Sequence, residues 1–229
     1  MAGASDMAPA AVQALLFDLD GTLIDSMPLH ELTWKQWHAV NGLPYDEAGF
    51  FAATAGRSGQ EILADLFPGK TRAELDALVD HKEALYRAIA ERELQAIPGA
   101  LALMADAAAR GLKQAVCTAA PDGNVAVAYA RFGLDRHLGT TVNPDQGFRG
   151  KPHPDLFLEA ARRLGVAPEH CVVFEDAPLG VEAARRAGMR AVALTTTMAA
   201  EAFTGFPNLV CAVPDFTFFD LATLLPRAA

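Results

Sequence analysis

Two carboxylates stand two residues apart where an apolar run ends, in the stretch Leu15-Leu16-Phe17-Asp18-Leu19-Asp20-Gly21-Thr22. Alternate residues of an extended segment point to the same side, so Asp18 and Asp20 can face one small volume. Carboxylates that lie so close repel each other unless a cation or a shared proton lies between them. The stretch is typical of a Mg²⁺-dependent phosphoryl-transfer site, with Asp18 as nucleophile and Asp20 as general acid and base. A strand that ends in an acidic turn would have the same residues, so both interpretations stay open at this point.

Further polar residues follow short apolar runs later in the chain. Thr118 comes after one such run, Lys151 lies in Gly150-Lys151-Pro152-His153-Pro154-Asp155, and Glu175-Asp176 directly follow another run. The carboxyl ends of strands line the ligand crevice of open α/β sheets, so these groups can converge with Asp18. Together they would provide a hydroxyl and an ammonium group for phosphate oxygens, and further acids for a metal. Taken singly, each has a simpler explanation as a turn hydroxyl, a solvated lysine or a pair of helix-capping acids.

The elements that would position these residues alternate between short apolar strands and helices. That alternation predicts an α/β fold, a parallel sheet with helices on both faces. Beside the strand that ends at Asp18, we expect strands at 114–117, 140–142, 171–174, 191–194 and 209–212, and helices at 100–110, 125–132, 154–164, 179–187 and from 216.

One block of the chain has a different pattern and contains no strand-like run. After a non-periodic link at 22–28, helical patterns occupy 28–41, 46–53, 59–66 and 72–93. We therefore expect two domains, an α/β core of residues 1–26 and 94–229 and an inserted α-helical cap of residues 27–93. Trp34 and Trp37 lie three residues apart on one helix face, which favours packing in the core of the cap.

Charge and composition limit the classes of partner. The 229 residues include 19 Lys and Arg against 28 Asp and Glu, which gives a formal net charge of −9. No broad basic face can form, which argues against nucleic acid or an anionic membrane as partner and leaves a small anionic substrate. The three cysteines are far apart in apolar stretches, which suits reduced thiols in the cytoplasm. Residues 1–10 lack a basic cluster, so we interpret them as a loose tail and not as a signal peptide.

Taken in order, these motifs resemble those of the haloacid dehalogenase superfamily of phosphohydrolases. The resemblance extends from about Leu15 to Ala212 and is closest to the branch of sugar-phosphate phosphatases and β-phosphoglucomutases with a small helical cap. The stretches 17–26, 150–155 and 174–184 are the basis of that closer match. The resemblance implies a Rossmann-like core, Mg²⁺ as cofactor and hydrolysis of small phosphate monoesters, such as sugar phosphates or phosphoglycolate.

The same resemblance implies a role for each core residue. Asp18 would attack phosphorus and form an aspartyl phosphate, and Asp20 would protonate the leaving group and then deprotonate water. Mg²⁺ would be held by the Asp18 carboxylate, the Asp20 backbone carbonyl and Asp176, with Glu175 one shell farther out. The residues expected to contact the phosphate are Gly21, Thr118, Ala119 and Lys151.

Two positions in the expected cap have two interpretations each. His30 lies where mutase-like relatives have a histidine near the acid/base, and it fits equally well as a histidine packed on a helix face. Arg57, in Ala55-Gly56-Arg57-Ser58-Gly59, fits a loop arginine that binds the anionic substrate or a solvated surface arginine. Closure of the cap would exclude bulk water and complete the site, with hinges near Ser26-Met27 and Leu94–Gly99.

Three other functions fit parts of this pattern. A β-phosphoglucomutase-type enzyme needs a second cationic phosphate pocket, but Ala120-Pro121 stand where the mutase pattern has serine and lysine. A dehalogenase needs no acid for a halide leaving group, so Asp20 argues against that chemistry. A phospho-acceptor module similar to a receiver domain also uses acids, a threonine and a lysine, but such modules are smaller and have no cap. We therefore expect a phosphatase, with the mutase as the alternative.

Overall fold

The computed structural model describes residues 10–46, 49–54 and 58–225 of the chain. Its main feature is a six-stranded sheet with strand order β5-β4-β1-β6-β7-β8. All neighbouring strands pair in parallel, which confirms the expected α/β fold. The predictions made for the tail at 1–9 and for Arg57 fall outside the described residues. The strands are β1 (Ala14–Phe17), β4 (Lys113–Cys117), β5 (Thr140–Val142), β6 (Cys171–Glu175), β7 (Arg190–Leu194) and β8 (Leu209–Val213).

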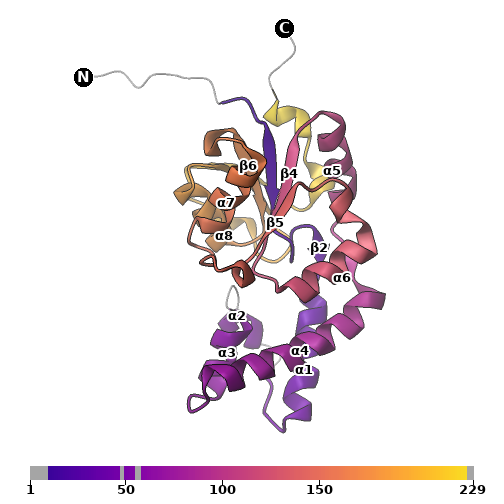
Figure 1. Ribbon diagram of the computed structural model, residues 1–229, viewed down its shortest axis with the longest axis vertical. Coiled ribbons are helices and arrows are strands. Elements are labelled where there is room, and N and C mark those ends of the chain that lie inside the picture. The colour runs from indigo at the N-terminus through magenta and orange to yellow at the C-terminus, as the bar shows by residue number, and fades with distance from the viewer. Residues whose placement is uncertain (1–9, 47–48, 55–57, 226–229) are drawn as a thin grey trace, which may run out of the picture.

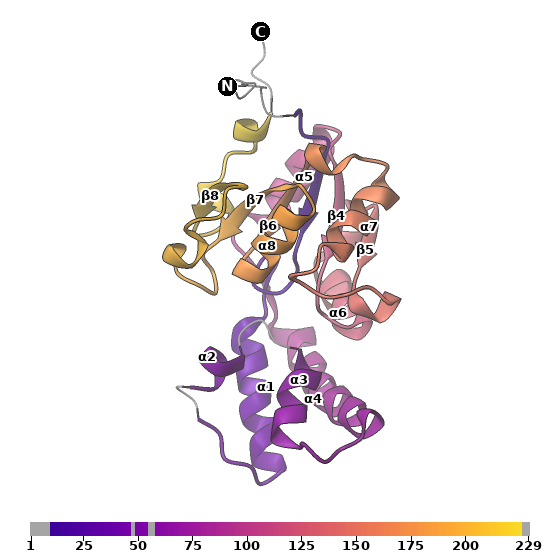
Figure 2. The same ribbon diagram turned by 90° about the vertical axis from the view of Figure 1, so that its left-hand side faces the viewer.

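Helices cover both faces of the sheet (Figures 1 and 2). On one face, α5 (Ala100–Ala109) and α6 (Asp122–Phe132) pack over a hydrophobic cluster. On the other face, α7 (Asp155–Leu164) and α8 (Pro178–Arg186) pack over a second cluster. The sheet is therefore buried on both sides, as parallel sheets generally are.

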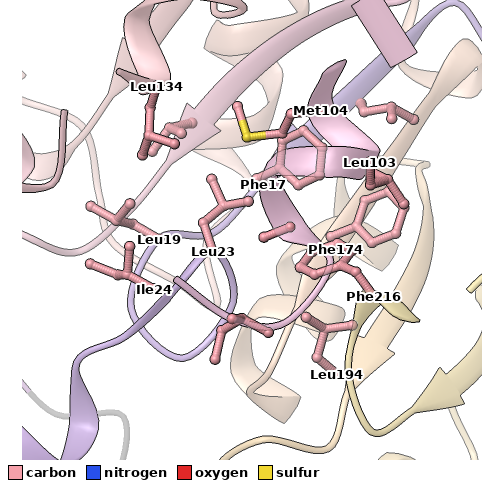
Figure 3. Packing of buried hydrophobic residues seen from close by; sticks show 14 of the residues in the cluster. Phe17, Leu19, Leu23, Ile24, Leu103, Met104, Leu134, Phe174, Leu194 and Phe216 are labelled. Carbon is pink, nitrogen blue, oxygen red and sulfur yellow. The ribbon is translucent and has the colours of Figure 1, made fainter. Parts of the chain in front are cut away.

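β1 lies in the interior of the sheet and is buried along its whole length. Leu15 and Phe17 belong to the cluster under α5 and α6, whereas Ala14 and Leu16 belong to the cluster under α7 and α8. Phe17 stacks on Phe174 with ring centroids 5.1 Å apart, inside the apolar cluster of Figure 3. A one-residue slip would exchange the side chains between the two clusters, so packing fixes the register of β1 and the place of the residue that follows it.

A second group of helices lies beyond the carboxyl ends of the strands (Figures 1 and 2). This helical part has a hydrophobic cluster of its own, in which Trp34 and Trp37 are buried, as expected. Capping boxes at Ser58 and Thr71 begin two of its helices and satisfy amides that would otherwise lack partners. Its helices are α1 (Met27–Val40), α2 (Phe50–Thr54), α3 (Gly59–Leu66) and α4 (Arg72–Glu93).

A short antiparallel ribbon joins the helical part to the α/β part. β2 (Ile24–Asp25) pairs with β3 (Gln95–Ala96), so the two crossings of the chain between the parts lie side by side. Only a link and turn residues are expected here from the sequence, because strands of two residues are too short to show alternation. The ribbon lies directly after the Asp18–Thr22 loop, so it connects the candidate site to the helical part.

Several boundaries differ from the expected ones. α6 begins at Asp122 and not at 125, because its first turn contains polar residues and a glycine that hide the helical pattern. α2 covers 50–54, a shorter segment than the expected helix at 46–53. The C-terminal segment forms two 3-10 helices, Phe216–Phe218 and Leu221–Leu224, instead of one short helix. Within the described residues, no helix combines the length and the apolar character needed to cross a membrane.

Trp37→Ala is expected to destabilise the helical part, because it removes a fully buried ring from a small cluster. Losses of about 3–5 kcal/mol are typical of such a change. Both tryptophans of the chain, Trp34 and Trp37, lie in the helical part, so tryptophan fluorescence during urea unfolding reports on this part in each protein. Val40→Ala on the same helix is the control, since Val40 is 73% exposed. Equal stability of the two variants would contradict the packing described for Trp37.

Candidate active site

The carboxyl ends of three neighbouring strands bring the candidate residues together. Phe17 of β1 is in register with Val116 of β4 and Phe174 of β6. The residues at these strand ends therefore lie along one edge of the sheet, and this edge faces the helical part (Figure 2). The buried polar residues that end or directly follow these three strands are Asp18, Thr118, Glu175 and Asp176.

Asp18, Glu175 and Asp176 form a buried acidic cluster, in which one oxygen of each carboxylate lies within 4.8 Å of the others. A set of carboxylate oxygens is the kind of donor set that Mg²⁺ prefers. The cluster therefore fits a hard divalent cation. Asp20 is not a member of the cluster, and its expected contribution, a backbone carbonyl, stays a prediction.

The titration of these acids reflects their crowding. Burial and the neighbouring carboxylates raise the pKa of Glu175 to about 8 and that of Asp176 to about 7, against the opposing effect of Lys151. Burial also raises the pKa of Asp18, although the ion pair with Lys151 acts in the opposite direction. These shifts express the cost of burying three negative charges beside one positive charge. A bound divalent cation would offset that cost.

Lys151 reaches the cluster from the loop before α7. Its ammonium group forms ion pairs with Asp18 and with Glu175, the latter at 2.5 Å, and lies 5.5 Å from the ring centroid of Phe157. Burial alone would lower the pKa of Lys151, but the two carboxylates raise it above its usual value. The Lys151–Pro152 peptide bond is cis. A lysine that stays charged beside Asp18 can neutralise charge on the oxygens of a phosphate group.

Two glycines allow the backbone to approach the acids closely. Gly21 has a φ of +77°, and a Cβ at this position would lie 2.3 Å from Oδ2 of Asp176. A Cβ on Gly180, near the start of α8, would lie 1.9 Å from the carboxyl carbon of Glu175. Any larger residue at either position would displace a carboxylate of the cluster, so the geometry of the acids depends on both glycines.

Asp20 has an environment different from that of Asp18. Its Oδ1 accepts a hydrogen bond of 2.6 Å from the Ser26 hydroxyl and lies 3.7 Å from Nε2 of His30. Burial alone would raise the pKa of Asp20, but His30, the Ser26 hydroxyl and the charge of Lys82 lower it below its usual value. Neighbouring carboxylates in distinct electrostatic environments can take separate chemical roles.

A chain of polar groups continues from Asp20 into the helical part. His30 stacks on Tyr86 with ring centroids 4.0 Å apart, and its Nδ1 lies 2.7 Å from Nζ of Lys82. An ammonium group can only donate, so Nδ1 of His30 accepts, and a neutral ring then has its proton on Nε2, which faces Asp20. His30 therefore lies beside the acid/base candidate Asp20 and also packs on Tyr86, so the structure is compatible with both interpretations made from the sequence.

Thr118 and Ala119 lie in the loop after β4. Thr118 accepts a hydrogen bond of 2.9 Å from the amide of Ala120, which agrees with its simpler explanation as a turn hydroxyl. The same hydroxyl keeps its own proton for another acceptor, so the two explanations are compatible. Ala119 is exposed, and its backbone amide is not occupied by any hydrogen bond described for this loop.

Four polar residues of the site are not among the site residues predicted from the sequence. Thr22 and Thr197 donate to the two oxygens of Asp176, over 3.0 and 2.6 Å. Ser26 donates to Asp20, and Lys82 contacts His30 beside it. Thr22 and Ser26 lie next to the Asp18–Asp20 motif, so the motif itself could have indicated them. Thr197 and Lys82 are distant in the sequence, and their residue types alone do not indicate a site.

Asp176→Asn is expected to stabilise the metal-free protein, because it removes one of the buried negative charges and keeps an acceptor for Thr22. At pH 8, above the raised pKa of about 7 of Asp176, this carboxyl is mostly ionised and its repulsion destabilises the folded state, since the unfolded chain ionises far below that pH. Calorimetry in a chelator should show a melting temperature a few degrees above that of the wild type.

Mg²⁺ provides the second measurement on the same variant. It should raise the melting temperature of the wild type and have much less effect on Asp176→Asn, because binding to the folded state stabilises it. Asp80→Asn, which removes one exposed acid, is the control and should behave as the wild type does. A variant that melts below the wild type in chelator would contradict the repulsive character of the cluster.

Comparisons with known proteins agree with this geometry. The profile of the haloacid dehalogenase-like hydrolases matches residues 12–188. Hexitol phosphatase A of Escherichia coli (strain K12) is 36% identical over 184 residues, which cover 80% of this chain and 82% of the relative. The β-phosphoglucomutase of Bacillus subtilis is 30% identical over 189 residues, which cover 79% of this chain and 82% of the relative.

A solved structure supports the same assignment. The crystal structure of a hydrolase of family IA from Entamoeba histolytica superposes with a TM-score of 0.86 at 26% identity, and the match covers 93% of this chain and 98% of that one. The sheet order, the site at the strand ends and these matches lead to one conclusion. The chain belongs to the haloacid dehalogenase-like hydrolases, in the branch that includes sugar-phosphate phosphatases and β-phosphoglucomutase.

Proposed function

We propose that this protein is a Mg²⁺-dependent phosphatase that hydrolyses small phosphate monoesters through an aspartyl-phosphate intermediate. The observation that supports this most is the buried set of Asp18, Lys151, Glu175 and Asp176, with Asp20 held separately beside it. Relatives named hexitol phosphatase A and fructose-1-phosphate phosphatase are 36% and 33% identical to this chain. Sugar phosphates and related polyol phosphates are therefore the substrate class that we propose, with phosphoglycolate as a further candidate.

The reaction would proceed in two displacements. A carboxylate oxygen of Asp18 forms a bond to phosphorus, the bond from phosphorus to the ester oxygen breaks, and Asp20 gives its proton to the leaving alkoxide. Asp20 then takes a proton from water as that water attacks the aspartyl phosphate, which releases inorganic phosphate and restores Asp18. Proton transfer of this kind contributes roughly 10²–10⁴-fold to a rate.

The surroundings of these residues support the charge changes that the reaction needs. The ammonium group of Lys151 and the hydroxyl of Thr118 can donate to phosphate oxygens, where negative charge is concentrated. Asp18 and Asp176 would hold Mg²⁺, with Glu175 behind them, and the cation would neutralise further charge on the phosphate. A dianionic phosphate beside Asp20 raises the proton affinity of that carboxylate, which favours its role as an acid.

We propose that residues 27–93 act as a cap domain over a core of residues 1–26 and 94–229. The edge of the sheet that holds Asp18 faces the helical part (Figure 2), and the β2–β3 ribbon forms both connections between the two. Motion about this ribbon would admit substrate and then exclude water. His30 would assist Asp20 in the closed state.

Charge and thiol chemistry support the remaining proposals on partners and compartment. The net charge of −9 favours a small anionic substrate held by local cations and disfavours nucleic acid and anionic membranes. Cys117, Cys171 and Cys211 are free thiols, which is the usual state in a reducing cytoplasm.

The alternative function is a β-phosphoglucomutase-type reaction, favoured by the relative of that name. A mutase must bind a bisphosphate, so it needs cations at a second phosphate position. The loop after β4 has Ala120 and Pro121, and α6 then begins with Asp122. This start of α6 offers a negative charge, so simple hydrolysis is the better proposal.

Phosphate release from a panel of monoesters tests the proposed function directly. The panel contains hexitol phosphates, fructose 1-phosphate, phosphoglycolate and glucose 1-phosphate with a bisphosphate primer, each with Mg²⁺ and with chelator. We expect repeated turnover with Mg²⁺ and none with chelator. Glucose 6-phosphate in place of free phosphate would establish the mutase instead, and a single turnover per chain would indicate a phospho-acceptor module.

Asp20→Asn is expected to lower kcat/KM for alkyl phosphates by about 10²–10⁴-fold, because the leaving alkoxide then lacks its proton donor. p-Nitrophenyl phosphate needs no proton for its leaving group, so it should still phosphorylate Asp18. Mass spectrometry should then detect the aspartyl phosphate, since its hydrolysis lacks the base. Asp25→Asn, at an exposed acid of β2, is the control for the change in charge. Wild-type rates of alkyl phosphate hydrolysis in Asp20→Asn would exclude the acid/base role.

A further inference from the structure

A buried polar contact joins the helical part to the α/β part near Asp20. Asn124, in the first turn of α6, donates from Nδ2 to Oε2 of Glu83 on α4 over 2.7 Å. Glu83 is 8% exposed and Asn124 is 3% exposed, so both groups lose water where the two parts meet. Arg87, one turn farther along α4, donates to Oδ1 of the same Asn124 over 3.3 Å. Asn124 thus uses both its donor and its acceptor across the interface.

The start of α6 is shaped for this approach. α4 and α6 lie against each other in both views (Figures 1 and 2). A Cβ on Gly123 would lie 3.1 Å from Nη1 of Arg87, so a small residue at this position gives the guanidinium its space. An asparagine is suited to the next position because its amide can donate to a carboxylate and accept from a guanidinium at once.

Glu83 connects this contact to Asp20. Its Oε1 lies 2.9 Å from Nζ of Lys82, which also lies 2.7 Å from Nδ1 of His30. Lys82 is 2% exposed, and a buried ammonium group depends on its carboxylate and hydrogen-bond partners for its position. The contacts therefore run without a break from the amide of Asn124 to His30 beside Asp20.

We propose that the Asn124–Glu83 hydrogen bond is a latch between the two parts, and that both residues are positioning residues for proton transfer at Asp20. This inference rests on the proposed function. With the latch formed, Glu83 holds Lys82 against His30, and His30 faces Asp20. When the parts separate, Asn124 and Glu83 both gain water, and Glu83 no longer fixes Lys82. A buried polar group that has lost its partner but has not gained water is unfavourable. The latch therefore has two discrete states, one hydrogen-bonded and one hydrated.

Asn124→Asp tests the latch itself, because it places a second carboxylate opposite Glu83. Small-angle X-ray scattering of the full chain with Mg²⁺ should give a larger radius of gyration for this variant than for the wild type. The double variant Glu83→Gln/Asn124→Asp again pairs an amide with a carboxylate and should return to the wild-type radius. Gln36→Glu adds one charge at an exposed position of α1 and should leave the radius unchanged. Equal radii for all proteins, or a double variant that stays expanded, would overturn the latch.

Leaving-group dependence tests the positioning role, since a general loss of structure would lower all rates alike. kcat/KM covers the steps up to departure of the leaving group, and a sugar alkoxide needs a proton where p-nitrophenolate does not. Asn124→Asp should lower kcat/KM for a sugar phosphate by about tenfold or more and for p-nitrophenyl phosphate by much less. Equal losses, or no loss, on both esters would overturn the positioning role. A wild type that hydrolyses neither ester would refute the proposed function, and the scattering measurement would still decide on the latch.

Discussion

An excess of buried negative charge at the ends of β1 and β6 is the constraint on which the rest of the site depends. Three carboxylates share one small volume with the ammonium group of Lys151, and their raised pKa values express the resulting strain. Such a set is stable only when a rigid framework holds it, and each acid directly follows or ends a strand that is buried on both faces. The packing of Phe17 on Phe174 thus determines where the charges lie, and the charges determine the affinity for a cation.

The second aspartate illustrates how two similar residues acquire different properties two positions apart. Asp18 belongs to the framework of the sheet, whereas Asp20 lies in the loop that leads to β2. The partners of Asp20, Ser26 and His30, come from the connection and from α1. The nucleophile candidate therefore depends on the α/β part alone, and the acid/base candidate depends on both parts.

The sequence predicts the sheet and its edge well, because short apolar runs between helices permit few alternatives. The carboxyl-end rule then brings Asp18, Thr118, Lys151 and Glu175-Asp176 together from segments far apart in the chain. The β2–β3 ribbon escapes prediction because strands of two residues have no detectable period. The contact of Lys82 with His30 also could not be predicted, since a lysine within a helix is expected to be solvated until its neighbours in space are known.

The location of Asp20 would allow the helical part to influence the proposed reaction without contributing to the acidic cluster of Asp18, Glu175 and Asp176. Ser26 precedes α1 directly and bonds to Asp20, while the β2–β3 pairing holds that connection in place. His30 lies one turn farther along α1, and Lys82 approaches it from α4. A rotation of the helical part about the ribbon would therefore keep the Ser26 contact and move His30 and Lys82 relative to Asp20. Proton transfer could then depend on closure, while the charges around Asp18 stay in the α/β part. A charged site of this kind tolerates little displacement, so it would be disturbed if its residues were divided between two moving parts.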